Sequence, residues 1–206
     1  MLSRGIACLI GYCFGCFLTG ELIAKRFAGK SASEIGSTGN PGMANIMVHV
    51  GFVPGLLVLL GDLLKCILAV IAARLIFPGT GRILTLYAGL GCTLGHDFPF
   101  WHRFRGGKGV ATSSAAMTLY APLWSLAAHI GGIILTVSTK YLCIAGVVVP
   151  LIFGACMLFL KNWEAAILSG VFLVLAVFCH GSSLLGIRNG TTEKTDVLAK
   201  LRKKKD

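Results

Sequence analysis

The chain has 206 residues, of which 55% are hydrophobic and only 13% are charged, with a mean hydropathy of +0.81. A water-soluble domain is usually about 45–50% apolar and about 25% charged, and a disordered chain needs low hydrophobicity. This composition therefore excludes both classes. The net charge of +11 would be compatible with binding to nucleic acid. The lysines and arginines, however, lie in short clusters between apolar runs, as in polytopic membrane proteins. We therefore expect no nucleic acid partner.

Runs of about 20 mainly apolar residues, the length that a membrane-spanning helix needs, recur along the chain. They cover residues 5–24, 46–77, 82–101, 141–160 and 163–187. A further apolar stretch, residues 107–138, is too long for one span at about 1.5 Å per residue and is short for two full spans.

Basic residues gather on the cytoplasmic side of membrane proteins, and this rule resolves the ambiguous stretch. If 107–138 crosses twice as short helices broken near Pro122, the basic clusters after the first span, after the third span and in the tail share one side. We therefore predict an all-α polytopic integral membrane protein of about seven transmembrane helices, two of them short. The N-terminus is expected outside and the C-terminus in the cytoplasm. Five spans with a re-entrant segment is the alternative.

The whole chain, residues 1–206, is predicted to form one domain that crosses the cell membrane several times. The lipid bilayer is its expected partner, and no obligate protein partner is expected. Residues from about 188 to 206 are predicted as a basic cytoplasmic tail that orients the chain and rests on anionic headgroups.

Two predicted cytoplasmic loops are rich in glycine. They read SEIGSTGNPGMAN at 33–45 and GHDFPFWHRFRGGKGVATS at 95–113. Glycine lets successive backbone N–H groups converge on an anion. The second loop runs into an apolar helix, which adds N–H groups at a helix N-terminus, the Lys108 cation and the hydroxyls of Thr112 and Ser113. Together these groups could bind a phosphate. The alternative interpretation of the loop is a tight turn between helices whose lysine only orients the chain in the membrane.

Two known phosphate and acyl-transfer patterns are absent. The nucleotide-binding pattern G-x-x-x-x-G-K-[ST] fails at Lys30 because Ala24 holds the first glycine position, and at Lys108 because Gly109 holds the hydroxyl position. The H-x-x-x-x-D pattern of soluble glycerolipid acyltransferases follows none of the five histidines. The C-x-x-C pair in the first span lies among apolar residues without further ligands nearby. We predict no metal and no cofactor.

The two loops together resemble those of the bacterial acyl-phosphate:glycerol-3-phosphate acyltransferases, the PlsY family. That family shows G-S-x-N-P-G-A-T-N in its first cytoplasmic loop and G-H-x-F-P-x-F-x-x-F-x-G-G-K-G-V-A-T in its second. The second pattern is nearly complete here from Gly95 to Thr112, and L-T-G-E-L-I-A-K at 18–25 is also family-like. The resemblance covers the chain from about residue 10 to the seventh span.

The resemblance implies transfer of an acyl group from acyl phosphate to the 1-hydroxyl of glycerol 3-phosphate, which gives lysophosphatidic acid and phosphate. It implies catalytic roles for Lys108, His96 and His180. It also implies substrate or phosphate binding by residues at positions of the three family motifs, namely Ser37, Thr38, Asn40, Gly42, Asn45, Gly106, Gly107, Gly109, Thr112 and Ser183. Arg188, which lies beside the third motif, is added to this set as a hypothesis that is explained below.

The general base of this reaction is left open by the sequence. His96 and His180 are candidates because an imidazole titrates near neutral pH. His96 is better explained as a brace for its loop, and a substrate phosphate oxygen could itself take the proton. Two other functions remain as alternatives: a membrane transporter or channel for a phosphorylated solute, and a family relative with an altered acceptor or lost activity.

The sequence departs from the family pattern in the first and third motifs. Ala44 stands where the family has Thr, and Val48 stands where an Arg is common. The third motif, roughly H-x-x-N-x-x-R-L-x-x-G-x-E, keeps only His180 and Gly190. The family's other residues are replaced by Ser183, Gly186, Ile187 and Thr192, with Glu193 one residue late. We hypothesise that Arg188, beside Asn189, restores the lost cation.

Asp62 and Lys65 form a D-x-x-K pattern, also family-like, inside the second apolar run. They lie one helical turn apart, so both side chains share a face of the helix. Charges within a membrane are costly and suggest a function. A buried ion pair that only fixes helix packing is an equally weighted alternative.

Overall fold

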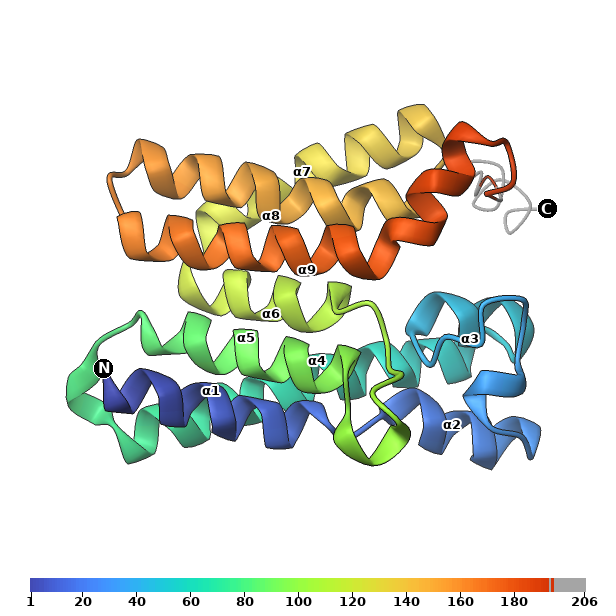
Figure 1. Ribbon diagram of the computed structural model, residues 1–206, viewed down its shortest axis with the longest axis horizontal. Helices are drawn as coiled ribbons and strands as arrows, with labels where there is room; N and C mark the ends of the chain where they lie inside the picture. The colour runs from blue at the N-terminus through green and yellow to red at the C-terminus, as the bar shows by residue number, and fades with distance from the viewer. Residues whose placement is uncertain (193, 195–206) are drawn as a thin grey trace. The chain divides into compact units, whose positions relative to one another are not determined.

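The structure, a computed structural model, describes residues 1–192 and 194. These residues contain α-helices and short 3-10 helices and no strand, which confirms the predicted all-α fold. The chain divides into two compact units, the first Met1–Tyr120 and the second from Ala121 onward, and each is treated by itself (Figure 1). Most of the predicted basic tail, residues 195–206, and Glu193 lie outside the described residues.

The first unit carries most of the predicted site. Its elements are α1 (Leu2–Gly15), α2 (Thr19–Ala28), η1 (Ala32–Glu34), α3 (Met43–His49), α4 (Phe52–Ile76), η2 (Pro78–Thr80), α5 (Leu84–Asp97), η3 (Phe100–His102) and α6 (Val110–Tyr120). The second unit holds three long helices, α7 (Pro122–Thr139), α8 (Leu142–Phe159) and α9 (Trp163–Arg188).

Five helical segments among the described residues are long and apolar enough to cross a bilayer. They are Leu2–Ala28, Phe52–Ile76, Pro122–Thr139, Leu142–Phe159 and Trp163–Arg188. The predicted break near Pro122 is confirmed, because α6 ends at Tyr120 and α7 begins at the proline, a residue suited to the first helical position. With 14 and 11 residues, α5 and α6 are shorter. The number of about seven crossings and their direction stay predictions.

The predicted first span is interrupted. α1 ends at Gly15 and α2 begins at Thr19, with Leu18 extended at φ −88° and ψ 94° between them. The second run is likewise divided, since Gly51, at φ 139°, separates the short helix α3 from α4. Apolar periodicity could not reveal either break, because the residues around both are as apolar as the helices. The first break has a polar cause, which lies in the site below.

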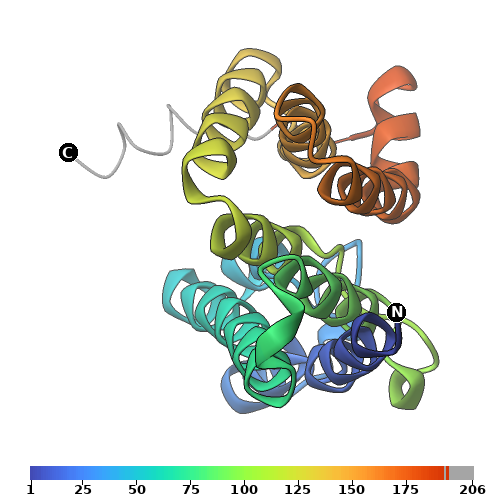
Figure 2. The same cartoon turned by 90° about the vertical axis from the view of Figure 1, so that its left-hand side faces the viewer.

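α1 and α5 pack backbone against backbone through glycines. A Cβ on Gly11 would lie 2.0 Å from the carbonyl oxygen of Ala88, and a Cβ on Gly91 would lie 1.8 Å from that of Cys8. Gly15 and Gly95 make equally close approaches one turn further along. Small residues four apart allow such contact between membrane helices. Figure 2 shows α1 in dark blue beside α5 in green, and this contact brings the end of α5 to the end of α1.

The second unit packs α8 against both α7 and α9. A Cβ on Gly132 of α7 would lie 2.8 Å from a methyl group of Val149 in α8. Between α8 and α9, the Ser169 hydroxyl of α9 donates a 2.7 Å hydrogen bond to the carbonyl of Pro150 in α8. This buried bond holds α9 to α8 at the level of the proline.

The glycine contact between α1 and α5 predicts a large effect of one substitution. Gly11→Leu should lower the thermal unfolding midpoint in detergent by roughly 5 °C or more, because the helices must separate to admit the side chain. Gly5→Leu is the matched control, since a Cβ at Gly5 on the same helix meets nothing within 4 Å. Equal midpoints for the two variants would contradict the close packing.

Candidate active site

A buried charge cluster joins three helices of the first unit. Lys65 Nζ lies 2.9 Å from Asp62 Oδ1, so the predicted ion pair is formed within α4, and 2.7 Å from His96 Nδ1 of α5. The side chains of all three residues are 5% exposed or less. Lys65 Nζ also donates to the carbonyls of Gly15, at 3.2 Å, and Phe17, at 2.9 Å. The break after α1 therefore turns backbone carbonyls toward the buried ammonium.

The second glycine-rich loop is tied to the same break. The indole Nε1 of Trp101 donates a 2.7 Å hydrogen bond to the Cys16 carbonyl. In the sequence, Cys16 lies between Gly15 and Phe17, whose carbonyls accept from Lys65. The Tyr12 hydroxyl donates to the Phe98 carbonyl at 2.9 Å. The end of α1 thus anchors both the charge cluster and the loop that follows α5.

The loop glycines fold tightly over the C-terminal end of α5. The N–H of Gly107 donates to the His96 carbonyl at 2.9 Å, and a Cβ on Gly107 would lie 1.9 Å from His96 Nε2. A Cβ on Gly106 would lie 2.0 Å from the His96 carbonyl oxygen. Gly109 has φ +65° and faces the Asp97 carboxylate, with Oδ2 2.8 Å from where a Cβ would stand. Only glycine can fill these positions without moving the loop away from His96.

The two hydroxyls that follow the loop both bond to its backbone. Thr112 is fully buried, donates to the Gly109 carbonyl at 3.1 Å and accepts from Thr93 at 2.9 Å. Ser113 also donates to the Gly109 carbonyl, at 2.7 Å. Both hydroxyls hold the start of α6 against the loop, while the half-buried Lys108 stands immediately before Gly109. The groups suited to an external anion are therefore Lys108 and the loop amides.

The first glycine-rich loop is shaped by its two asparagines. Asn45 Nδ2 donates to the carbonyls of Ile35 and Asn40, each at 2.9 Å. Asn40 Oδ1 accepts from the N–H of Gly42 at 2.7 Å. Ser37 and Thr38 are exposed near the tip. The asparagines act as a scaffold, and the two hydroxyls remain available to a ligand.

Two residues that fasten this loop were missed from the sequence. The Pro41 carbonyl oxygen lies 1.6 Å from where a Cβ of Gly20 would stand, so the loop rests directly on α2. The buried Glu21 accepts from the Ala32 N–H at 2.9 Å and from the Ser31 hydroxyl at 3.2 Å. The signal was present as T-G-E inside the family-like stretch 18–25, where a glycine and a carboxylate interrupt an apolar run.

The third motif lies at the end of α9 in the second unit. His180 is buried, with Nδ1 2.9 Å from the Ala176 carbonyl. Because a carbonyl only accepts, Nδ1 carries the proton and Nε2 is the nitrogen able to accept one.

The residues that replace the family's residues in this motif contact one another in the turn after α9. After Gly190, at φ +70°, the chain turns back and the Thr191 N–H donates to the Gly186 carbonyl at 2.8 Å. The Thr192 hydroxyl donates to the Ser183 carbonyl at 2.6 Å. A Cβ on Gly186 would lie 2.3 Å from that hydroxyl, so a larger residue there would clash with the turn. Arg188, in the last turn of α9, is exposed.

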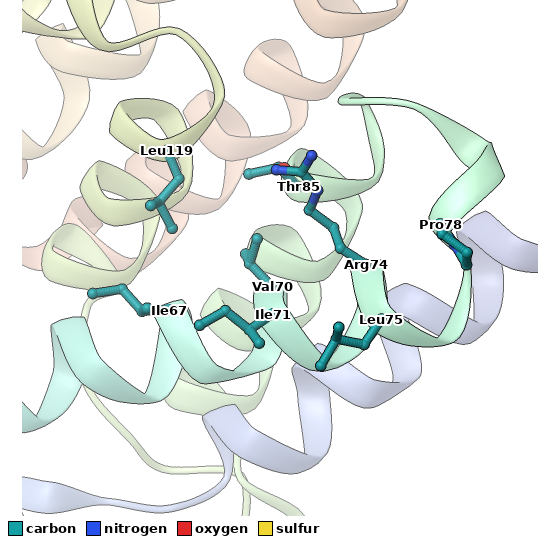
Figure 3. A pocket seen from close by; sticks show the side chains of 8 residues that line it. All are labelled: Ile67, Val70, Ile71, Arg74, Leu75, Pro78, Thr85 and Leu119. Atoms are coloured by element: carbon teal, nitrogen blue, oxygen red, sulfur yellow. The ribbon is translucent and has the colours of Figure 1, made fainter.

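One groove in the first unit lies away from these residues. It has a volume of about 460 Å³ and is lined by apolar side chains of α4 together with Arg74, Pro78, Thr85 and Leu119. Figure 3 shows the lining residues. The groove contains none of the predicted site residues, and it lies toward the beginning of α5 whereas His96 stands near that helix's end.

The fold and the site define an all-helical membrane protein with glycine-rich loops, one of them built over a buried charge cluster. The sequence matches the family model described as glycerol-3-phosphate acyltransferase over residues 5–190. The chain therefore belongs to the glycerol-3-phosphate acyltransferase family, which confirms the predicted resemblance. It is an acyltransferase, as the sequence predicted, rather than a transporter or channel.

Individual relatives agree with this family. A glycerol-3-phosphate acyltransferase 1 of Lactobacillus acidophilus is 38% identical over 203 residues, 98% of this chain and 97% of the relative. A glycerol-3-phosphate acyltransferase of Clostridioides difficile is 34% identical over 200 residues, 94% and 96% of the two chains. The crystal structure of PlsY (YgiH), an integral membrane glycerol 3-phosphate acyltransferase in its glycerol 3-phosphate form, matches with a TM-score of 0.83. It is 25% identical, and the match covers 97% of this chain and 98% of that one.

The scaffold role of Asn45 predicts a local effect. Asn45→Ala should leave the Ile35 and Asn40 carbonyls without their donor and speed amide hydrogen exchange in residues 33–42 at least several-fold. Val48→Ala is the matched control on the same helix, because Val48 is 64% exposed. Unchanged exchange in the Asn45 variant would show that the loop does not depend on this side chain.

Proposed function

We propose that this protein transfers an acyl group from acyl phosphate to the 1-hydroxyl of sn-glycerol 3-phosphate, releasing lysophosphatidic acid and inorganic phosphate. The observation that carries the proposal is the loop Gly106–Gly109, folded over His96 with Lys108 at the start of α6, in a chain of this family. The solved relative in its glycerol 3-phosphate form supports that acceptor.

The loop supplies what the transition state requires. The acceptor hydroxyl attacks the acyl carbonyl, and the carbonyl oxygen becomes an oxyanion as the phosphate prepares to leave. Lys108 and the backbone N–H groups around it stabilise both negative charges, which is usually the largest contribution in acyl transfer. Because acyl phosphate is already activated, no covalent enzyme intermediate is needed.

The hydroxyl proton needs an acceptor, and we assign it to His180. Its Nδ1 is committed to the Ala176 carbonyl, which leaves Nε2 as the basic nitrogen. The exposed hydroxyls of Ser37 and Thr38 in the first unit are proposed to bind the acceptor phosphate. For the third motif, we separately propose phosphate-binding roles for Arg188 and Ser183.

We further propose that the two units act as one acyltransferase domain in the cell membrane, since the family match at residues 5–190 runs through both. The glycine-rich loops would face the cytoplasm, the side to which the basic clusters assign them. The high apolar fraction would then anchor the protein and let the acyl chain lie among the helices.

A reconstituted assay tests the reaction and its donor. Purified protein with glycerol 3-phosphate should form lysophosphatidic acid from acyl phosphate and not from acyl-CoA or acyl carrier protein. Lys108→Ala should lower kcat by about 10²–10³-fold through loss of charge stabilisation. Lys161→Gln, in the turn between α8 and α9, removes a charge elsewhere and should retain wild-type rates.

Three outcomes would overturn this proposal. Folded wild-type protein without turnover from any donor would exclude the reaction. Turnover from acyl-CoA alone would make the donor wrong. Equal losses in the Lys108 and Lys161 variants would remove Lys108 from the site.

The altered third motif predicts a binding role for Arg188. Arg188→Ala should raise the KM for glycerol 3-phosphate about tenfold or more, with a smaller change in kcat, because a cation that holds a phosphate in both ground and transition states mainly affects binding. Arg26→Ala, an exposed base at the end of α2, serves as control. An unchanged KM in the Arg188 variant would show that Arg188 does not replace the family's cation.

A further inference from the structure

The surroundings of Lys65 restrict which nitrogen of His96 can carry a proton. Four acceptors lie within 3.2 Å of Nζ: Asp62 Oδ1, His96 Nδ1 and the carbonyls of Gly15 and Phe17. A lysine ammonium has three N–H donors and no acceptor. At 2.7 Å, the shortest of the four distances, Nδ1 must accept from this ammonium and therefore carries no proton of its own.

The alternative, a proton moved from Lys65 to His96, is disfavoured. Lysine is the much stronger base in water, and two backbone carbonyls and a carboxylate favour the charged amine at this position. The Asp62 carboxylate balances that single charge within the buried cluster. His96 is then a neutral imidazole, and its one proton must reside on Nε2.

The protonated nitrogen faces the glycine-rich loop. Nε2 lies so close to the Gly107 backbone that a Cβ there would stand 1.9 Å away. Among the described residues, the hydrogen bond and the ion-pair contact of the His96 ring are both made by Nδ1. The imidazole N–H is thus presented at the loop whose Lys108 and amides suit a phosphate.

We propose that Asp62 and Lys65 are positioning residues that hold His96 as the neutral Nε2–H tautomer, so that His96 donates a hydrogen bond to a substrate oxygen at the loop Gly106–Gly109. This proposal deepens the function stated above and rests on it for the identity of the substrate. His96 then stabilises charge and does not remove the hydroxyl proton, because its only lone pair is occupied by Lys65. His180, with the opposite tautomer, is left for the base.

The tautomer can be read directly and without substrate. Protein labelled with ¹⁵N at histidine is studied in detergent by long-range ¹⁵N–¹H correlation, and His96→Gln identifies the His96 signals by subtraction. We expect wild-type His96 to show a protonated Nε2 and an unprotonated Nδ1. A protonated Nδ1 would overturn the proposal, whatever the activity of the protein.

One variant should reverse the tautomer. In Lys65→Met, the Asp62 carboxylate, 3.6 Å from His96 Nδ1, becomes the nearest acceptor and should draw the proton to Nδ1. A retained Nε2–H pattern in folded Lys65→Met protein would show that Lys65 does not control His96. Size-exclusion elution and circular dichroism establish folding, and if this variant does not fold, the wild-type spectrum still decides.

Activity separates a hydrogen-bond donor from a base. A glutamine amide can donate from nearly the position of Nε2 but cannot accept a proton as a base. His96→Gln should therefore retain activity within about tenfold, while His96→Ala should lose about 10²–10³-fold in kcat. Equal losses in both would contradict the donor role. Wild-type protein without turnover would reject the proposed reaction and leave the tautomer result standing.

Discussion

The buried Lys65 ammonium is the constraint on which the first unit depends. A charge inside an apolar helix bundle is costly unless it is paired and its hydrogen bonds are satisfied. Asp62 supplies the countercharge within the same helix, but the two carbonyls come from the gap between α1 and α2. A continuous first helix would have kept those carbonyls in its own ladder. The polar requirement of one side chain therefore explains why an apolar run is broken.

The same cluster explains why α1 and α5 must approach so closely. His96 stands at the end of α5 and the carbonyls stand at the end of α1, so Lys65 can reach both only when the two helices are in backbone contact. Gly11 and Gly91 allow that contact because neither carries a Cβ. The glycines of the helices and those of the loop thus have different roles: the first let α1 and α5 approach, and the second let the loop lie directly against His96 and Asp97.

The third motif shows how a family pattern can change without losing local order. Gly186 removes the family's cation but leaves space for the turn after α9, and the Thr192 hydroxyl satisfies a carbonyl where the family has a glutamate. The replacements are mutually consistent, so the altered motif is a folded alternative to the family's version. What differs is the position of the cation: residue 186 is a glycine, and the basic residue of the last turn of α9 is Arg188.

Much of this protein could be predicted from its sequence alone. The lengths of the apolar runs and the positions of the basic clusters predicted the all-helical membrane fold and the break at Pro122. Both features are predictable because the preference of an apolar run for the bilayer and the restricted backbone of proline depend on nearby residues only. The pattern from Gly95 to Thr112 predicted the family because a match of this length rarely arises by chance. The structure adds that a Cβ on any of its four glycines would clash with a neighbouring group. The Asp62–Lys65 pair followed from helical spacing alone.

Only the tertiary structure decided what those residues do. It turned the Thr112 hydroxyl inward, broke the first span, recruited Gly20 and Glu21 to hold the first loop, and set Lys65 against His96 Nδ1. These outcomes depend on which groups meet across helices far apart in the chain. Hydrogen bonds are directional and short in range, so the choice of a donor, an acceptor or a tautomer is made only when the packed helices bring the partners together.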